Sequence, residues 1–335
     1  MSSMFLTPRA FRVVGITTIA AVYFLILVGG IVRASGAGMG CPDWPKCFGQ
    51  WIPPTHESQL PEDYQEIYAH RGYADTTFNV VKTWTEYVNR LTGVTIGFLI
   101  FLTLIFSFAY TRTDKVVPVL SFVSFLLVGF QGWLGAVVVA SNLTPYLITL
   151  HMIVALVLVA LLIYAIARSQ CDQLAVIETK SRPALMPLLI IVLALSLVQV
   201  VLGTRVREHV DELAVLSANR AYWMESLGIG FYIHRSFSIV MLALNAAAAA
   251  VIWKDGGAST LLSRCALALL GLIAIEIATG AIMYYFAIPP ILQPVHLVLA
   301  SLVFGLQFFM IIAYRYGRAT ALLKNTAAGT SARAV

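Results

Sequence analysis

Eight long apolar stretches dominate this chain and limit what it can fold into. Each is about 20 residues or longer, the length that an α-helix needs to cross a bilayer. Only 11% of the residues are charged, against about 25% in soluble proteins. The sequence therefore predicts an all-α membrane protein with eight transmembrane helices. The stretches are 11–33, 83–109, 116–140, 146–168, 183–204, 229–253, 260–286 and 290–314.

Lysines and arginines in the short loops gather on one side of these predicted helices. Arg112 and Lys115 follow the second helix, and Lys180 and Arg182 follow the fourth. Such loops face the cytoplasm in membrane proteins. We therefore expect a multi-pass protein of the inner (plasma) membrane, with both termini cytoplasmic and no cleaved signal peptide. The net charge of +6 follows from this topology and gives no indication of nucleic-acid binding.

The two halves of the chain repeat each other. Both halves begin on the cytoplasmic side, so the pattern predicts two tandem four-helix bundles related as a parallel repeat. We expect the glycines to allow close helix packing, and Gln131 and Glu276 to form interhelical hydrogen bonds. The aligned pairs are Gly29 with Gly203, Arg33 with Arg207, Asn89 with His234, Arg90 with Arg235, Gln131 with Glu276, Gly135 with Gly280, and His151 with His296.

Two long loops, 34–82 and 205–228, lie on the outer side in this topology. The first contains Cys41 and Cys47, and an oxidising exterior favours a disulfide between them. The repeat divides the chain into five segments. These are the N-terminus with the first helix (1–34), the outer loop with the cysteine pair (35–82), the rest of the first half (83–168), the second half (183–314) and a cytoplasmic tail (315–335).

Three histidines, His151, His234 and His296, lie within about two turns of the outer ends of their helices. Ionisable residues inside a membrane are costly and usually functional. Neutral imidazole binds haem iron, and helix bundles hold cofactors between facing helices. We therefore predict His234 and His296 as axial ligands of one haem in the second half. The alternative is hydrogen bonding between helices.

The first half has only one of these two ligands. His151 matches His296, but Asn89 takes the position of His234. Asparagine is a poor iron ligand, so a haem here would keep a single axial histidine or take another ligand. His56 and His70 in the outer loop could reach in, or they could be ordinary solvated loop histidines.

Charged residues flank these positions. Arg90 and Arg235 could pair with a haem propionate, or they could extend to the membrane interface. Glu86 lies one turn from Asn89 and has no acidic counterpart in the second half. Its carboxylate could accept a proton or stabilise a cationic intermediate. The alternative is a salt bridge with Arg90.

The stretch SGAGMGCPDWPKCFGQWIPP (35–54) resembles the first outer loop of the haem A synthase family, with its cysteine pair around a DWP core. The resemblance extends over nearly the whole chain. It includes the ExxxR pattern of Glu86 and Arg90, QxxxG before His151, the pair His234–Arg235, and His296.

This resemblance implies an eight-helix membrane oxidoreductase that oxidises the methyl group of haem O to the formyl group of haem A by successive hydroxylations. It implies a haem b cofactor on His234 and His296, with the substrate haem in the first half at His151. Glu86, Cys41 and Cys47 would be the activity-linked residues. The chain departs from the family at Asn89, where a second histidine is usual.

Two other functions fit the same histidines. One is a non-catalytic di-haem cytochrome that transfers electrons through the membrane, and the other is a haem-handling or transport protein. Pure electron transfer does not need Glu86 with the cysteine loop, and product analysis separates all three functions. The expected partners are haem O as substrate, membrane lipid, an unidentified electron donor and the haem O synthase that makes the substrate.

Overall fold

The computed structural model describes residues 6–74, 76–175, 183–256 and 260–331, and it is mainly helical. Eight of its helices are long and apolar enough to cross a membrane, which confirms the predicted fold class. Within the described residues, the only extended pairing is a single bridge between Cys47 and Gln50. The eight helices are α1 (Pro8–Ala34), α3 (Val80–Ser107), α4 (Val116–Ala140), α5 (Pro145–Arg168), α7 (Leu185–Leu216), α9 (Ile229–Gly256), α10 (Leu261–Tyr285) and α11 (Leu292–Ser331).

Side-chain caps set where several of these helices begin. The Thr7 hydroxyl accepts a hydrogen bond from the N–H of Ala10 at 3.1 Å and starts α1. The Asn79 side chain accepts from the N–H of Lys82 at 3.0 Å and starts α3. A capping oxygen satisfies a backbone N–H that has no partner within the helix. Because of these caps, α1 and α3 each begin three residues before the apolar stretch that predicted them.

The second outer loop is largely helical, which corrects the prediction of a loop over 205–228. Helix α7 continues to Leu216, and the short helix α8 covers Arg220–Glu225. Ion pairs one turn apart extend α7 beyond the apolar stretch: Arg205 with Glu208 at 2.8 Å, and Arg207 with Asp211 at 2.7 Å. Such pairs stabilise an exposed helix although they are not apolar.

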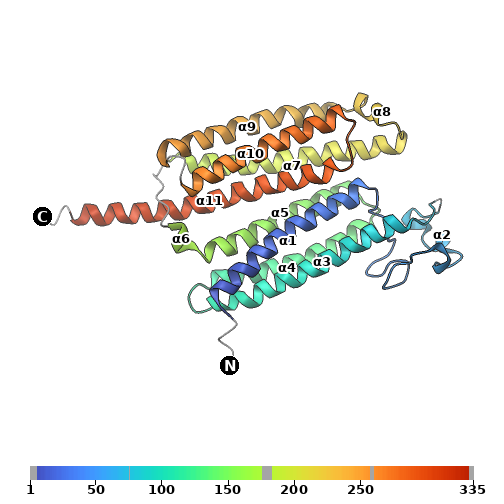
Figure 1. Ribbon diagram of the computed structural model, residues 1–335, viewed down its shortest axis with the longest axis horizontal. Coiled ribbons are helices and arrows are strands. Elements are labelled where there is room, and N and C mark those ends of the chain that lie inside the picture. Colours follow the sequence, from blue (N-terminus) through green and yellow to red (C-terminus); the bar gives the residue numbers. More distant parts are fainter. Residues whose placement is uncertain (1–5, 75, 176–182, 257–259, 332–335) are drawn as a thin grey trace. The chain divides into compact units, whose positions relative to one another are not determined.

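The chain forms two compact units. The first comprises Met1–Ala109, Ser121–Val159 and Pro289–Val298, and the second comprises Tyr110–Leu120, Ala160–Ile288 and Leu299–Val335. In the first unit α1 lies against α3, and in the second α7 and α10 lie against α9 (Figure 1). The five predicted segment boundaries and the tandem repeat of the halves stay predictions.

Polar contacts are buried inside both units. In the first, the hydroxyls of Thr18 and Thr103 lie 2.9 Å apart between α1 and α3. In the second, Ser196 donates to Gln307 at 2.7 Å, and the Gln307 amide donates to Asn245 at 3.1 Å. Each of these five buried side chains thus has a hydrogen-bond partner, as a low-dielectric interior favours.

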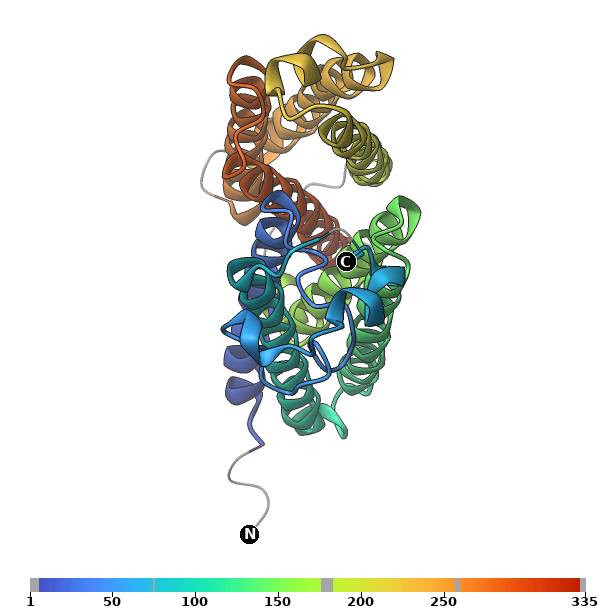
Figure 2. The ribbon, with the colours of Figure 1, turned by 90° about the vertical axis from the view of Figure 1, so that its right-hand side faces the viewer.

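The first outer loop lies beside the N-terminal end of α3 (Figures 1 and 2). It contains the short helix α2 (Tyr64–Ile67) and a cluster of aromatic rings. Phe48 lies at the centre of this cluster, and its ring meets the rings of Tyr68 and Tyr73 edge to face at 5.5 and 5.3 Å. The loop therefore has its own small core.

Candidate functional site

A disulfide between Cys41 and Cys47 closes the start of the outer loop, as predicted from the sequence. Asp43 holds the turn inside this ring. Its two carboxylate oxygens accept hydrogen bonds from the N–H groups of Phe48 at 2.6 Å and Gly49 at 2.8 Å. Both cysteines are completely buried. The sequence CPDWPKC therefore forms one fixed turn, which we call the disulfide loop (residues 41–47).

The disulfide loop rests directly on the backbone of α3, and Gly40 makes this possible. A Cβ atom at Gly40 would lie 2.4 Å from the carbonyl oxygen of Lys82 and 2.9 Å from the nitrogen of Thr83. No side chain fits in that space. The Thr83 hydroxyl also donates to the Gly40 carbonyl at 2.9 Å. The approach of the loop to α3 thus requires glycine at this position.

The side chain of Glu86, on α3, binds the disulfide loop. The residue is only 3% exposed. One carboxylate oxygen accepts a hydrogen bond from the backbone N–H of Cys41 at 2.7 Å. The other oxygen pairs with the guanidinium of Arg90, one turn further along α3. The salt bridge that the sequence left as an alternative for Glu86 is therefore present.

Arg90 completes this contact from the same helix. Its guanidinium donates to the carbonyl oxygens of Cys41 at 3.0 Å, Asp43 at 2.6 Å and Lys46 at 3.0 Å, in addition to Glu86. An arginine side chain has five N–H donors, and here all five have an acceptor. The predicted pairing of Arg90 with a haem propionate stays a prediction and would require one of these acceptors to be exchanged.

The aromatic cluster supports the loop from its other side. The Tyr73 hydroxyl donates to the carbonyl of Met39 at 2.7 Å. Burial, with the nearby charge of Glu86, raises the pKa of Tyr73 well above its usual range. Tyr73 thus stays neutral and remains a donor at any physiological pH.

His151 lies on α5 and is held by two residues of α4. The amide nitrogen of Gln131 donates to the His151 backbone carbonyl at 3.0 Å, which confirms the predicted interhelical role of Gln131. Gly135 lies beside the imidazole ring, and a Cβ there would be 3.5 Å from the ring carbon Cε1. The close packing predicted for this glycine is therefore present.

His234 on α9 has the same two contacts, made by α7. The amide nitrogen of Gln199 donates to the His234 carbonyl at 3.0 Å. A Cβ at Gly203 would lie 3.1 Å from Cε1 of the His234 ring. Gln199 was not predicted from the sequence, although the pattern QxxxG at 199–203 repeats the one at 131–135. The structure brings Asn89 to the equivalent glycine of α1, with a Cβ at Gly29 3.9 Å from its side-chain oxygen.

The remaining predicted ligands are not grouped in one unit. His296 lies in the segment Pro289–Val298 of the first unit, whereas His234 lies in the second. Their pairing on one haem stays a prediction. His56 caps a short 3₁₀ turn through its ring nitrogen, 2.8 Å from the Ser58 hydroxyl, and His70 is exposed. Both fit the alternative of ordinary loop histidines.

Arg235 differs from its counterpart Arg90. It is exposed, and its guanidinium lies over the ring of Tyr232 at 5.2 Å. The same guanidinium lies 5.8 Å from the centre of the Phe231 ring. The repeat position is thus occupied by a fully bonded arginine in one unit and an accessible one in the other.

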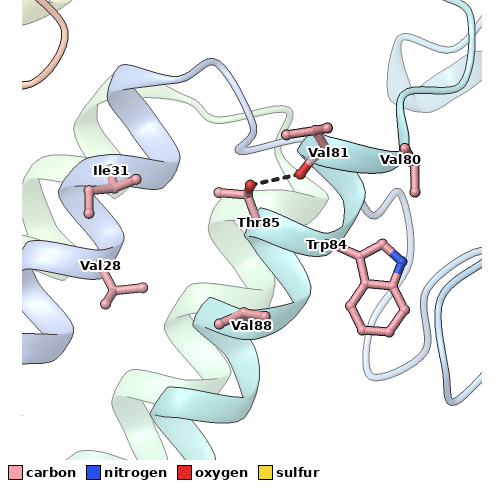
Figure 3. Close-up of a pocket in the computed structure, with 7 residues that line it drawn as sticks. All are labelled: Val28, Ile31, Val80, Val81, Trp84, Thr85 and Val88. Atoms are coloured by element: carbon pink, nitrogen blue, oxygen red, sulfur yellow. Dashed lines mark hydrogen bonds between the residues drawn. The ribbon is translucent and has the colours of Figure 1, made fainter. Parts of the chain in front are cut away.

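An open apolar pocket of about 540 Å³ lies between the C-terminal part of α1 and the N-terminal part of α3 (Figure 3). Val28 and Ile31 face it from α1, and Val81 and Val88 face it from α3. The Thr85 hydroxyl at this pocket bonds to its own helix, at the carbonyl of Val81. The pocket therefore offers no free polar group from that residue.

Fold and site together define a class: a multi-pass membrane protein with a disulfide loop fixed on a buried Glu–Arg pair and with helix-held histidines. Within this class, the chain belongs to the cytochrome oxidase assembly protein family, whose family model matches residues 12–308.

Several relatives of known name are similar to the chain. The heme A synthase of Shewanella oneidensis is 29% identical over 214 residues, which cover 63% of this chain and 62% of that protein. The heme A synthase of Bartonella quintana is 32% identical, over 42% of this chain and 43% of that protein. These two matches span less than two thirds of the relatives' lengths. The heme A synthase of Geobacillus kaustophilus is 26% identical, over 95% of this chain and 96% of that protein.

Proposed function

We propose that this protein is a haem A synthase, a membrane oxidoreductase that converts the methyl group of haem O into the formyl group of haem A by successive hydroxylations. The observation that supports this most is the disulfide loop bound to Glu86 and Arg90, in a chain whose similarity to a heme A synthase extends over 95% of its length. Electron transfer alone does not need that arrangement.

The resident cofactor in this proposal is haem b, with His234 and His296 as its axial ligands. This part rests on the sequence repeat and on the surroundings of His234. Gly203 leaves room beside the His234 ring, as a ligand imidazole needs. Arg235 has donors available for a propionate. Bound there, haem b would supply electron transfer to the substrate.

The substrate haem O is assigned to the first half, with its iron on His151. Asn89 is not a strong iron ligand, so the substrate iron would keep one protein ligand and an open position. Gly135 gives the His151 ring the same clearance that Gly203 gives His234. The side-chain oxygen of Asn89 is buried and has no hydrogen-bond partner among the described residues. It therefore fits a position beside a bound ligand better than one in ordinary helix packing.

Glu86, Cys41 and Cys47 are the proposed catalytic residues. Arg90 and the Cys41 N–H both bond to the Glu86 carboxylate and favour its anionic form. In that form it can stabilise positive charge that develops on the substrate, or accept a proton by giving up one partner. Because the loop backbone binds Glu86 directly, opening the disulfide would disturb the carboxylate as well.

The proposed location is the inner membrane, with both termini in the cytoplasm and the disulfide loop outside. Surrounding lipid covers the helices. The electron donor is unidentified. Haem O reaches the site from the haem O synthase that makes it.

The test is expression in cells that make haem O but no haem A, followed by chromatography of the haems in the membranes. We expect haem A, with or without a hydroxylated intermediate, in cells with the wild-type protein. The variant H151A should leave haem O unconverted at equal protein level. Haem O alone in wild-type membranes, with haem b bound to the protein, would instead indicate an electron carrier.

A further inference from the structure

Two turns of the chain hold residues other than glycine in the left-handed region of the backbone. The first joins α4 to α5, with a φ of 52° at Asn142 and 62° at Leu143. The second joins α10 to α11, with a φ of 52° at Ala287 and 54° at Ile288. A Cβ atom makes this conformation unfavourable, most of all in bulky or branched residues. Such strained residues persist only where their surroundings hold them, and they cluster at functional sites.

The two turns have the same construction. In each, the N–H of the second left-handed residue donates to the carbonyl five residues earlier, at 2.9 Å from Leu143 and at 2.7 Å from Ile288. Each turn also lies the same number of residues before a histidine, His151 in the first half and His296 in the second. The strained turn thus accompanies both histidines of this aligned pair.

An arginine from each outer loop binds one of these turns. In the first unit, Arg71 donates to the carbonyl of Ala140, the last residue of α4. In the second, Arg220 of α8 donates to the carbonyls of Ala287 at 3.4 Å and Ile288 at 2.5 Å. Hydrogen bonds from a charged donor are stronger than those between neutral groups. Because the contact recurs at both turns, it belongs to the way in which the strained conformation is held.

The first outer loop holds the α4–α5 turn at two further points. The Asn142 amide donates to the carbonyl of His70 at 3.3 Å, next to Arg71. Gly38, shortly before the disulfide loop, lies against the side chain of Leu143, and a Cβ at Gly38 would be 3.0 Å from Cδ1 of this leucine. An early and a late segment of the outer loop therefore both contact the turn.

We propose that Arg71 is a positioning residue for His151, because it holds the strained turn and thereby fixes where α5 begins. His151 lies within about two helical turns of the first residue of α5, Pro145. A helix is stiff over that length, so a shift of the turn displaces the imidazole as well. The inference rests on the proposed function, since it takes His151 as the ligand of the substrate iron.

The experiment compares R71A and R71K with wild type, as full-length protein made in cells that supply haem O and purified in detergent. A displacement of about 1 Å can slow a reaction about 10²-fold, so R71A should convert haem O up to about 10²-fold more slowly. The visible and EPR signals of the haem O on His151 should change, whereas those of haem b should not. R71K keeps a charged donor for the Ala140 carbonyl and should restore most of the conversion.

The matched control is R205A. Arg205 belongs to the second outer loop and pairs with Glu208 of its own helix at 2.8 Å, so its loss removes the same charge without affecting a turn. It should convert haem O like wild type. R71A with the conversion and haem O spectrum of wild type, or R205A with the changes of R71A, would overturn the inference and leave the proposed function intact. Wild-type protein that forms no oxidised haem would overturn both.

A second variant tests the strained turn itself and keeps the inference testable where R71A folds poorly. Glycine adopts a positive φ without the cost that a Cβ imposes, so L143G should make the turn less dependent on Arg71. The double variant R71A/L143G should therefore exceed R71A in protein yield and in conversion of haem O. A double variant that yields no more protein and converts haem O no faster than R71A would overturn the turn as the link between Arg71 and His151.

Discussion

The carboxylate of Glu86 accepts a hydrogen bond from the backbone N–H of Cys41 at 2.7 Å, although 45 residues separate them. A membrane-helix carboxylate is thereby joined to the outer disulfide loop. Arg90 joins the same two elements by bonding to both Glu86 and the Cys41 carbonyl. A substitution at one of these three residues should therefore change the hydrogen bonds of the other two.

Glu86→Gln removes the charge but keeps a hydrogen-bond acceptor for the Cys41 N–H. General acid–base groups contribute about 10²- to 10⁴-fold, so turnover should fall by a factor in that range while the haem b spectrum is retained. Haem O or a hydroxylated intermediate should accumulate. Haem stoichiometry and product ratio are measured in one preparation.

The control is the variant E57Q. Glu57 is an exposed carboxylate of the first outer loop near the Tyr64 hydroxyl, and its replacement should leave the protein like wild type. Normal haem A production by the Glu86 variant would rule out its catalytic role.

Gly40→Ala places a methyl group 2.4 Å from the carbonyl oxygen of Lys82. The loop must move away from α3, which breaks the contacts of Glu86 and Thr83 with it. We expect loss of activity and faster proteolysis of the outer loop. Gly93→Ala on the same helix is the control, because a Cβ there meets nothing within 4 Å. Equal protease resistance of the two variants would contradict the described approach of the loop.

Cys41 and Cys47 should resist alkylation in aerobically prepared protein without reductant, whereas Cys171, which is free and partly exposed, should be labelled. Mass spectrometry reads both results from one sample. Reduction should free the pair and lower loop stability by about 2–3 kcal/mol, by the loop-entropy relation. Labelling of all three cysteines before reduction would show that the disulfide does not form.

His234→Ala should abolish the low-spin haem b spectrum, because it removes one of two strong axial ligands. His296→Ala should do the same, with the membrane fold retained. His56→Ala, which alters only the cap of an exposed 3₁₀ turn, serves as the control. A wild-type reduced spectrum in either of the first two variants would make the ligand assignment wrong.

Much of the fold follows from the sequence because it depends on local pattern. The apolar runs predict all eight helices. The caps Thr7 and Asn79 explain why α1 and α3 begin before the apolar stretches that predict them. The extension of α7 to Leu216 was missed because it rests on ion pairs such as Arg207–Asp211 in a polar stretch.

The site was harder to predict because its contacts join distant parts of the chain. The spacing of Glu86 and Arg90 suggested their salt bridge. Nothing local indicated that Arg90 would also bind the carbonyls of Asp43 and Lys46, since this requires the close approach that Gly40 permits. Gln199, in contrast, was within reach of the sequence, because its QxxxG pattern copies that of Gln131.

The most direct test of the central claim is chromatography of the haems extracted from the purified protein, made in cells that supply haem O. A haem A synthase should yield haem b together with haem O and either haem A or a hydroxylated intermediate. In the Glu86→Gln protein, haem b should persist while the oxidised products disappear. Haem b as the only haem in wild-type protein, with haem O abundant in the same membranes, would contradict the proposed activity.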